Sequence, residues 1–479
     1  MSKNSGDLKN GTFLNPILRG NYADPSIIRV GNDYYMVNTS YKYTPGLIVW
    51  HSMDLVNWTP IGTALEQLNG DVWAPELVFY KGIYYIYFPA DKTNWVVTAK
   101  DPRGPWSKPI NLKTKYIDPG HVVGPDSKRY LHLSGGNMAE LLEDGLSVIG
   151  KTTKVYEPWR YPDHWEVEGF SPEGPKLKYY NGYYYLTIAI GGTAGPPTSH
   201  MVAASRSKTP WGPWEHSPYN PIIRTNSKDE KWWSQGHGTL IDTPSGEWWM
   251  VFHAYENNLH TLGRHTMLLP IEWTEDGWFK IPDQIDYQQP IRKPEGESVS
   301  HGFPTVDKFD RKELGLQWQW FGEPERDRFY IENKALVVNG YEEGIHSPLL
   351  YMPGDPYYEA EVEIEADVDA EARFLLFYDH SAFFGISVVA EGVRHFRTFK
   401  QYRVEHFDGK SVHVRIRNEH NIVSFYYKDS QGIWKKYDKV IDCSGFHHNT
   451  FGGFLSLRIG LDVNGNGKAR FRNFQYRSL

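Results

Sequence analysis

The chain of 479 residues has one cysteine, Cys443, which excludes an internal disulfide and a cysteine-based zinc site. It has no apolar run near the roughly 20 residues of a membrane-spanning helix. The net charge is −7, and without a basic excess neither nucleic acid nor a membrane surface is an expected partner. The opening MSKNSGDLKNGTFLNP lacks the apolar core of a secretory signal, so we expect a cytoplasmic protein, unless the chain was trimmed from an exported precursor.

Aromatic residues, by contrast, are abundant: they make up 15% of the chain, with 18 Trp and 32 Tyr. Such residues favour β-strands, and exposed aromatic faces suit the apolar faces of sugars. Strand and turn signals dominate, and no long stretch keeps a helical period. The sequence therefore predicts an all-β protein.

A loose repeat organises the first 280 residues. ADPSIIRVGNDYYMVNTS, WAPELVFYKGIYYIYFPA and PEGPKLKYYNGYYYLTIAIGG each open on a polar residue, form a strand, turn, and continue as an aromatic strand. The five unit starts are marked by Asp24, Trp73, Asp118, Glu173 and His237, at spacings of 49, 45, 55 and 64 residues. This is the size of a four-stranded blade, so the repeat predicts a five-bladed β-propeller. A pair of sandwiches would not explain five matched starts.

The predicted domains are the propeller over 1–292, a linker over 293–304 and a second domain over 305–479. The linker, KPEGESVSHGFP, is polar and rich in Gly, Ser and Pro. Beyond it, alternating stretches such as YYEAEVEIEADV and VHVRIRNE predict a β-sandwich of jelly-roll or lectin type.

The propeller explains why charged residues stand at the strand starts. The innermost strands line a central channel, so Asp24, Asp118, Glu173 and His237 are expected to converge on one axis. A carboxylate is costly to bury in an apolar core, whereas a water-filled axial pocket can solvate it.

These motifs together resemble glycoside hydrolase family 43, whose exo-acting members remove arabinofuranose or xylose from plant polysaccharides. The matching stretches, in order over residues 15 to about 282, are ADPSII, WAPEL, IDP, EGPKLKYYNGYYYL, GHGTL and GRHTMLLPIEWTEDGW. The segment beginning DKFDRKELGLQWQW resembles the concanavalin-like sandwich that follows the propeller in β-xylosidase-type members.

The resemblance implies roles for five residues. Asp24 corresponds to the general base and Glu173 to the general acid, while Asp118 orients the acid and tunes its pKa. Arg264 corresponds to a substrate-binding arginine. His237 lies on the axis, where the family often binds calcium directly or through water.

Further sugar contacts are expected from aromatic and loop residues. Trp73 is similar to the aromatic wall of the family's sugar pocket, and Trp50, His51, Tyr255 and the long loop 191–200 could add contacts. In the sandwich, the aromatic turn YDHSAFFG suggests that Phe383 or Phe384 reaches over the pocket and closes it to long chains. If so, truncation at residue 300 leaves a folded propeller with altered substrate preference.

Several assignments have rivals in the sequence itself. Glu166 and Glu168 compete with Glu173 as the acid, and Asp126 competes with Asp118. Simpler structural roles compete as well: an Asp before proline can cap a turn, a lone His can lie in the core, and Trp can be packing.

The expected function is exo-hydrolysis of terminal α-L-arabinofuranosyl residues, β-D-xylosyl residues or both from plant hemicellulose, with inversion by single displacement. No organic cofactor is expected, and calcium near His237 is the only expected metal. The alternatives are an endo-α-1,5-L-arabinanase, a carbohydrate-binding propeller without catalysis and a levansucrase-like transferase. The sequence does not decide between a monomer and a homo-oligomer.

Overall fold

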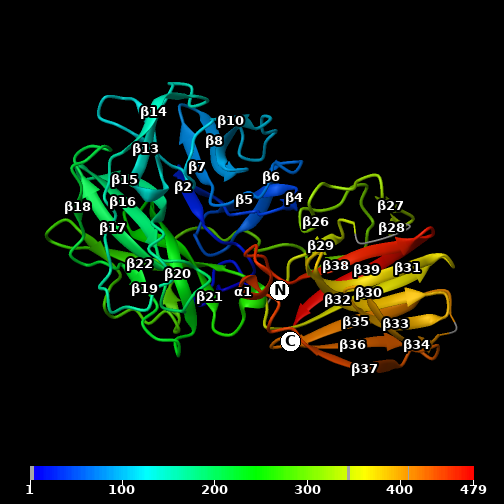
Figure 1. Cartoon of the computed structure of the whole chain (residues 1–479). Coiled ribbons are helices and arrows are strands. Elements are labelled where there is room, and N and C mark those ends of the chain that lie inside the picture. Colours follow the sequence, from blue (N-terminus) through cyan, green and yellow to red (C-terminus); the bar gives the residue numbers. More distant parts are fainter. Residues whose placement is uncertain (1–4, 342–345, 408) are drawn as a thin grey trace.

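The computed structural model describes residues 5–341, 346–407 and 409–479, and its regular secondary structure is almost entirely β-strand. A ring of radiating sheets formed by the first part of the chain lies beside a two-layered sheet structure formed by the last part (Figure 1). Within these ranges, no helix has the length and apolar character required to cross a membrane.

Five antiparallel sheets form the blades of the ring. The first contains β2 (Ser26–Val30), β3 (Asp33–Val37), β5 (Gly46–Ser52) and β6 (Thr59–Leu65). The second contains β7 (Glu76–Tyr80), β8 (Ile83–Ala90), β9 (Thr93–Ala99) and β10 (Ile110–Asn111). The third contains β11 (Gly120–Val123), β12 (Arg129–Leu133), β13 (Asn137–Leu141) and β14 (Val148–Lys154), with a short 3-10 turn, η1 (Ser134–Gly136).

The last two blades follow the same order. The fourth contains β15 (Glu173–Tyr180), β16 (Tyr183–Ile190), β17 (Met201–Ser207), β18 (Glu215–His216) and β19 (Ile223–Arg224). The fifth contains β20 (Trp232–Asp242), β21 (Trp248–Glu256), β22 (His265–Trp273) and β23 (Phe279–Lys280), with η2 (His260–Leu262) before β22. The predicted five-bladed propeller is therefore confirmed.

The ring is closed. The inner strands β2, β7, β11, β15 and β20 contact one another in succession, and β20 contacts β2. Strands such as β8 and β16 are buried along almost their whole length, which explains why they are continuously apolar and aromatic. At the ends of the domain, β1 (Thr12–Phe13) pairs with β24 (Ile291–Arg292).

Two facing sheets form the C-terminal sandwich. One contains β25 (Val306–Asp307), β27 (Phe329–Glu332), β28 (Ala335–Asn339), β30 (Tyr357–Ala366), β35 (Val412–Glu419), β36 (Ile422–Lys428), β37 (Trp434–Asp442) and β39 (Lys468–Ser478). The other contains β26 (Gln319–Phe321), β29 (Leu349–Tyr351), β31 (Ala370–Asp379), β32 (Ala382–Val389), β33 (Gly392–Arg397), β34 (Lys400–His406) and β38 (Arg458–Gly465). Alternate side chains of these strands fill one large apolar core.

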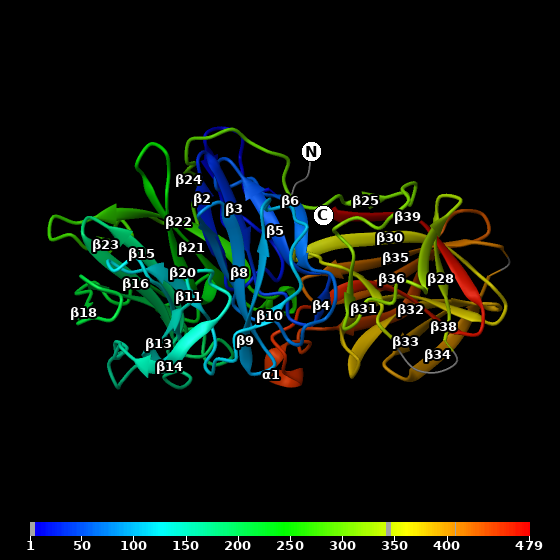
Figure 2. The same ribbon diagram turned by 90° about the horizontal axis from the view of Figure 1, so that it is seen from above.

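The propeller lends a strand to the sandwich. β4 (Tyr43–Thr44), from the first blade's connection, pairs with β26 and so extends the second sheet. The segment 293–304 also lies against the propeller, where the Phe303 ring is 5.1 Å from the Trp50 ring. The short helix α1 (His448–Phe451) lies at the boundary between the two domains (Figure 2). The domains are thus joined by a hydrogen-bonded seam as well as by the linker.

Candidate active site

Three predicted site residues share an uncommon backbone conformation at the starts of their blades. Asp24, Asp118 and His237 have φ angles of 54°, 59° and 53°. Asp and His are among the few residues besides Gly that tolerate this left-handed region. Glu173 is followed instead by Gly174, with φ of 62°. Such strained positions cluster at functional sites, because the surrounding structure must hold them.

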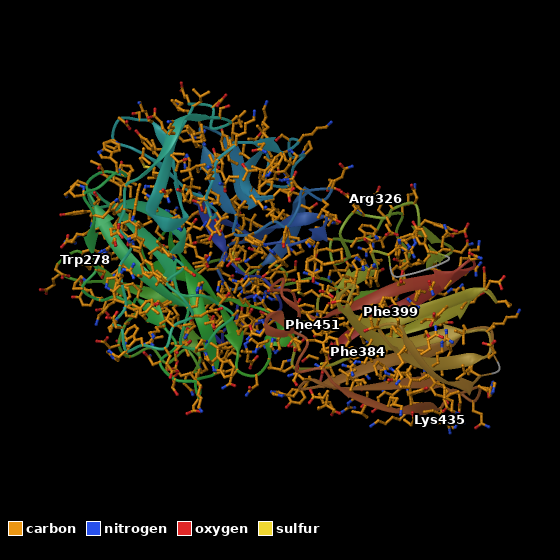
Figure 3. The ribbon with its side chains drawn as sticks, in the orientation of Figure 1. Trp278, Arg326, Phe384, Phe399, Lys435 and Phe451 are labelled. Carbon is orange, nitrogen blue, oxygen red and sulfur yellow. The ribbon has the colours of Figure 1, made fainter. Side chains whose placement is uncertain are left out.

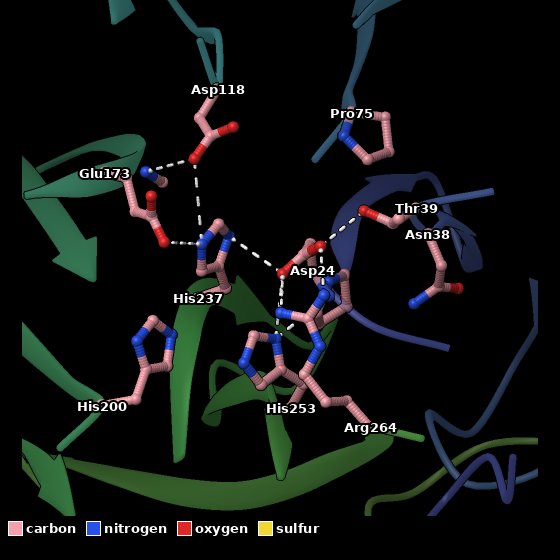
Figure 4. Close-up of polar contacts among 12 residues, drawn as sticks. Asp24, Asn38, Thr39, Pro75, Asp118, Glu173, His200, His237, His253 and Arg264 are labelled. Atoms are coloured by element: carbon pink, nitrogen blue, oxygen red, sulfur yellow. Dashed lines mark hydrogen bonds and ion pairs between the residues drawn. The ribbon is translucent and has the colours of Figure 1, made fainter. Parts of the chain in front are cut away.

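His237 lies at the centre of the converging residues (Figure 4). Its Nδ1 is 3.4 Å from Oδ1 of Asp24, and its Nε2 is 3.6 Å from Oε1 of Glu173 and 3.8 Å from Oδ2 of Asp118. Asp24 and Glu173 therefore lie at different edges of one imidazole. An inverting pair has its carboxyl groups roughly 6.5–9.5 Å apart, with a water molecule between them.

Asp24 is held as a carboxylate. It is 4% exposed, and Nη1 of Arg264 lies 3.1 Å from its Oδ1. The Thr39 hydroxyl donates a hydrogen bond to Oδ2. Burial would raise the pKa of Asp24, but the positive charges of Arg264 and His237 outweigh it and hold that pKa well below its usual value. Arg264, expected as a substrate-binding residue, thus pairs with the Asp24 carboxylate.

Asp118 and Glu173 form the opposite side of the site. Burial and the neighbouring Glu173 carboxylate raise the pKa of Asp118 to about 7. The backbone N–H of Gly174 donates a hydrogen bond to Oδ2 of Asp118, which links the two residues through the start of β15. The Glu173 side chain is 27% exposed, so a substrate can reach it. This pair keeps a proton near neutral pH, as an acid catalyst requires.

His237 lies between the two sides, and the carboxylates around it favour its protonated form. Burial opposes protonation, but Asp24, a hydrogen bond to Glu173, and Asp118 raise the pKa of His237. His253 lies beneath it and accepts a hydrogen bond at Nδ1 from the Asp24 backbone N–H, at 3.1 Å. Burial lowers the pKa of His253 to about 3, so its ring is neutral. His253 fixes the strained start of β2, a role that no sequence motif indicated.

These groups open into a pocket with a volume of about 370 Å³. Trp73, 39% exposed, forms part of its wall as expected, and Gly192, Thr193 and Ala194 of the predicted loop form another part. A third wall comes from the sandwich. The rings of His448 and Phe454 stack with their centroids 3.5 Å apart, and both line the pocket. The sequence analysis missed both residues.

Phe384, expected over the pocket, lies elsewhere. It is fully buried in β32, and its ring is 5.0 Å from that of Phe446 within the sandwich core (Figure 3). Phe383 is also fully buried in the same strand. The turn is a tight connection between β31 and β32 that is too short to project these rings, so this prediction was wrong.

Three other expected contacts are also outside the pocket lining. Trp50 is 1% exposed and packs its ring 5.2 Å from that of Tyr22. His51 lies on β5, the third strand of its blade, where Nε2 is 2.6 Å from Oδ1 of Asp33. Tyr255 is buried beside His260, with ring centroids 4.7 Å apart. Packing explains the Trp50 and Tyr255 rings and the contact with Asp33 explains His51, so the prediction that these residues bind sugar was wrong.

The alternative carboxylates differ from the predicted ones in where they lie relative to the pocket and to His237. Asp126 is exposed, accepts a hydrogen bond from the Tyr130 hydroxyl at 2.6 Å and lies outside the pocket lining. Glu166 is also exposed and outside the lining. Glu168 does line the pocket, but it is Glu173 that contacts His237.

The described residues offer calcium few ligands. Asp118, Glu173 and His237 have donor atoms within 4.8 Å of one another. Calcium takes six to eight oxygen ligands, whereas this set supplies two carboxylates and one nitrogen. A cation held there would also occupy the carboxyl pair that keeps the proton. The residues therefore fit calcium poorly; an axial calcium stays a prediction, and no step below depends on it.

Comparison with known proteins identifies the family. The model of glycosyl hydrolases family 43 matches residues 13–279. This chain belongs to that family. The family match covers the five blades and includes Asp24, Asp118, Glu173, His237 and Arg264.

Two curated relatives are similar over much of the chain. A non-reducing end α-L-arabinofuranosidase of Bacteroides ovatus is 35% identical over 344 residues, which cover 67% of this chain and 64% of that protein. A xylan 1,3-β-xylosidase of a Vibrio species is 33% identical over 419 residues, which cover 72% of this chain and 76% of that protein. The chain thus spans less than two thirds of the Bacteroides protein.

Among solved structures, a family 43 protein of Bacillus licheniformis aligns with 98% of this chain and 100% of its own, with a TM-score of 0.89 and 27% identity. A xylan β-1,4-xylosidase of Bacillus halodurans aligns with 97% of this chain and 100% of its own, with a TM-score of 0.86 and 25% identity. Both alignments extend over the sandwich as well as the propeller.

Proposed function

We propose that this glycoside hydrolase removes terminal α-L-arabinofuranosyl and β-D-xylosyl residues from plant hemicellulose or its oligosaccharides, with inversion at the anomeric carbon. The observation that carries the proposal is the placement of Asp24 and Glu173 at different edges of the His237 ring, in one pocket. The names of the relatives support the two sugar classes.

In the proposed mechanism, the Asp24 carboxylate takes a proton from a water molecule, which attacks the anomeric carbon. Glu173, supplied with a proton from the pair that it forms with Asp118, donates it to the departing oxygen. Arg264 and His237 keep Asp24 negatively charged, and Thr39 and the His253 ring hold its position. No covalent sugar–enzyme bond forms in this sequence.

The walls of the pocket favour exo action over endo action. Loop residues 192–194 on one side and His448 and Phe454 on another enclose the carboxylates, whereas an endo-arabinanase needs an open groove across the propeller face. A binding propeller without catalysis would not need three carboxyl groups around a buried histidine.

The test uses aryl α-L-arabinofuranoside and aryl β-D-xyloside with the wild type, Asp24→Ala and Glu173→Ala. We expect the wild type to hydrolyse at least one substrate and both variants to lose about 100-fold or more in kcat. NMR of the first-formed sugar should show the inverted anomer. Activity that survives both substitutions, or retention of configuration, would contradict the proposal.

A further inference from the structure

The catalytic pocket contains a fourth carboxyl group, to which the mechanism above gives no role. Glu168 lines the pocket together with Asp24, Asp118 and Glu173. A carboxylate oxygen of each of the other three lies 3.4–3.8 Å from a ring nitrogen of His237. In the part of the chain that the structure describes, no hydrogen bond or ion pair reaches the Glu168 carboxylate, and the residue is exposed. This acceptor therefore remains available to a ligand.

The backbone of Glu168 is fixed to the loop 191–200. Its N–H donates a hydrogen bond to the Ser199 hydroxyl oxygen at 2.7 Å, and its carbonyl accepts one from the Gly192 N–H at 2.9 Å. Ser199 is fully buried. Two residues earlier, the Glu166 carbonyl accepts a hydrogen bond from the Thr198 hydroxyl at 3.0 Å. The segment that carries Glu168 is thus held in place before any ligand binds.

Two glycines of the same loop make room for the Glu168 side chain. A Cβ atom added at Gly192 would lie 2.4 Å from Oε2 of Glu168, and one added at Gly195 would lie 2.3 Å from its Cβ. Any larger residue at either position would displace Glu168 from the pocket wall. The loop therefore fits closely around an acidic side chain that forms no bond within the protein.

The chemistry of this group suits a sugar with neighbouring hydroxyl groups. A carboxylate is an acceptor only, and its two oxygens can each receive a hydroxyl proton. Hydrogen bonds to a charged acceptor are stronger than those between neutral groups. A solvated charge at the surface would need neither the two glycines nor the buried serine.

We propose that Glu168 is a specificity-determining residue that accepts hydrogen bonds from vicinal hydroxyl groups of the terminal pentosyl residue. This inference rests on the proposed function and deepens it, because it names a group that recognises the sugar without taking part in the proton transfers. Removing one of the contacted hydroxyls from the sugar, or the carboxylate from the protein, then removes the same interaction.

The test combines variants of the protein with analogues of the substrate. The variants are Glu168→Ala and Glu168→Gln, with Glu166→Gln as the matched control, since Glu166 is an exposed acid of the same segment outside the pocket lining. The substrates are the aryl pentoside that the wild type hydrolyses best and its monodeoxy analogues, each lacking one hydroxyl of the sugar.

For the complete pentoside, Glu168→Ala should lower kcat/KM by about 10- to 100-fold, whatever the leaving group, and Glu168→Gln should lower it less. The control should match the wild type. The analogue without a contacted hydroxyl should lose a similar factor with the wild type but little more with Glu168→Ala, because the interaction is already absent. A merely structural role would instead slow every analogue by the same factor.

Two results would overturn the inference. One is an unchanged kcat/KM in Glu168→Ala, and the other is a set of deoxy effects that are the same in this variant and in the wild type. Either result, with pentosides still hydrolysed, would leave the proposed function intact. A wild type that hydrolyses no pentoside would contradict the proposed function itself.

Discussion

Nη1 of Arg264 lies 3.1 Å from Oδ1 of Asp24, and both side chains are buried. An arginine buried beside a carboxylate keeps it ionised, because protonation would leave the guanidinium charge without a partner. The pair therefore sets the lower pH limit at which Asp24 can act as a base.

Replacing Arg264 should move the acid limb of the pH profile. Asp24 is active when ionised, so activity is present above its pKa and is lost as the pH falls through it. Arg264→Met removes the main cause of the low pKa of Asp24, and the acid limb of kcat/KM should shift to higher pH. Arg264→Lys keeps a positive charge beside Asp24 and should shift the acid limb less. Equal acid limbs in Met and Lys variants would show that the charge has no such role.

Glu173→Gln should discriminate between leaving groups. Without an acid, a poor leaving group departs slowly, so kcat for xylobiose should fall by about 100- to 10,000-fold. A dinitrophenyl glycoside needs little protonation and should lose much less. Glu168→Gln, which alters another carboxylate of the pocket, is the control and should show no dependence on the leaving group. If Glu168→Gln gave this pattern instead, the acid would be Glu168.

The alkaline limb should report the proton of the carboxyl pair. The pKa of Asp118 is raised to about 7, so kcat/KM, which needs this proton, should be maintained below about pH 7 and fall above it. Asp118→Asn removes the like charge beside Glu173, and the limb should then move to lower pH. An unchanged limb in this variant would separate Asp118 from the acid function.

Phe454→Ala should weaken substrate binding. Loss of this aromatic wall should raise KM for the aryl glycosides by about 2- to 10-fold, with the fold still stable. Phe384→Ala is the contrasting variant: it removes a ring from the sandwich core and should lower the free energy of unfolding by about 3–5 kcal/mol. Urea unfolding together with kinetics separates the two effects, and a KM change only in Phe384→Ala would reverse the assignment.

Lys176→Met should destabilise the propeller. Its Nζ lies 2.7 Å from Oε2 of Glu76, and both side chains are buried where the inner strands meet. Removing one partner leaves an uncompensated charge and should lower the free energy of unfolding by about 3–5 kcal/mol. Adding Glu76→Gln to the Lys176→Met variant should restore part of the lost free energy of unfolding. Lys81→Met, which breaks an exposed pair with Glu143, should change stability little in the same urea titration.

The repeat made most of the propeller predictable from sequence. Its markers recur at every blade start, and the four polar ones converge in the structure because inner strands share one axis. The family resemblance favoured Asp118 over Asp126, and the coordinates separate the two residues because only Asp118 lines the pocket.

The wall contributed by the sandwich was less predictable. Strand alternation shows which residues face a core, but not which connection crosses to another domain. Phe384 and Trp50 are aromatic residues in strands, and both rings pack against other aromatic rings in the interior. Phe454 lies in an irregular segment after the four-residue helix α1, where no periodic pattern marks it. Arg264 lines the pocket, but its pairing with Asp24 could not be predicted, because the two residues are far apart in sequence and meet only in the fold.

The pairing of β4 with β26 has a practical consequence for protein engineering. A chain cut near residue 300 would leave Tyr43 and Thr44 as an orphaned sheet edge, and would remove His448 and Phe454 from the catalytic pocket at the same time. The sandwich is therefore no interchangeable module: chimaeras made by swapping it between relatives must exchange the donated strand with it.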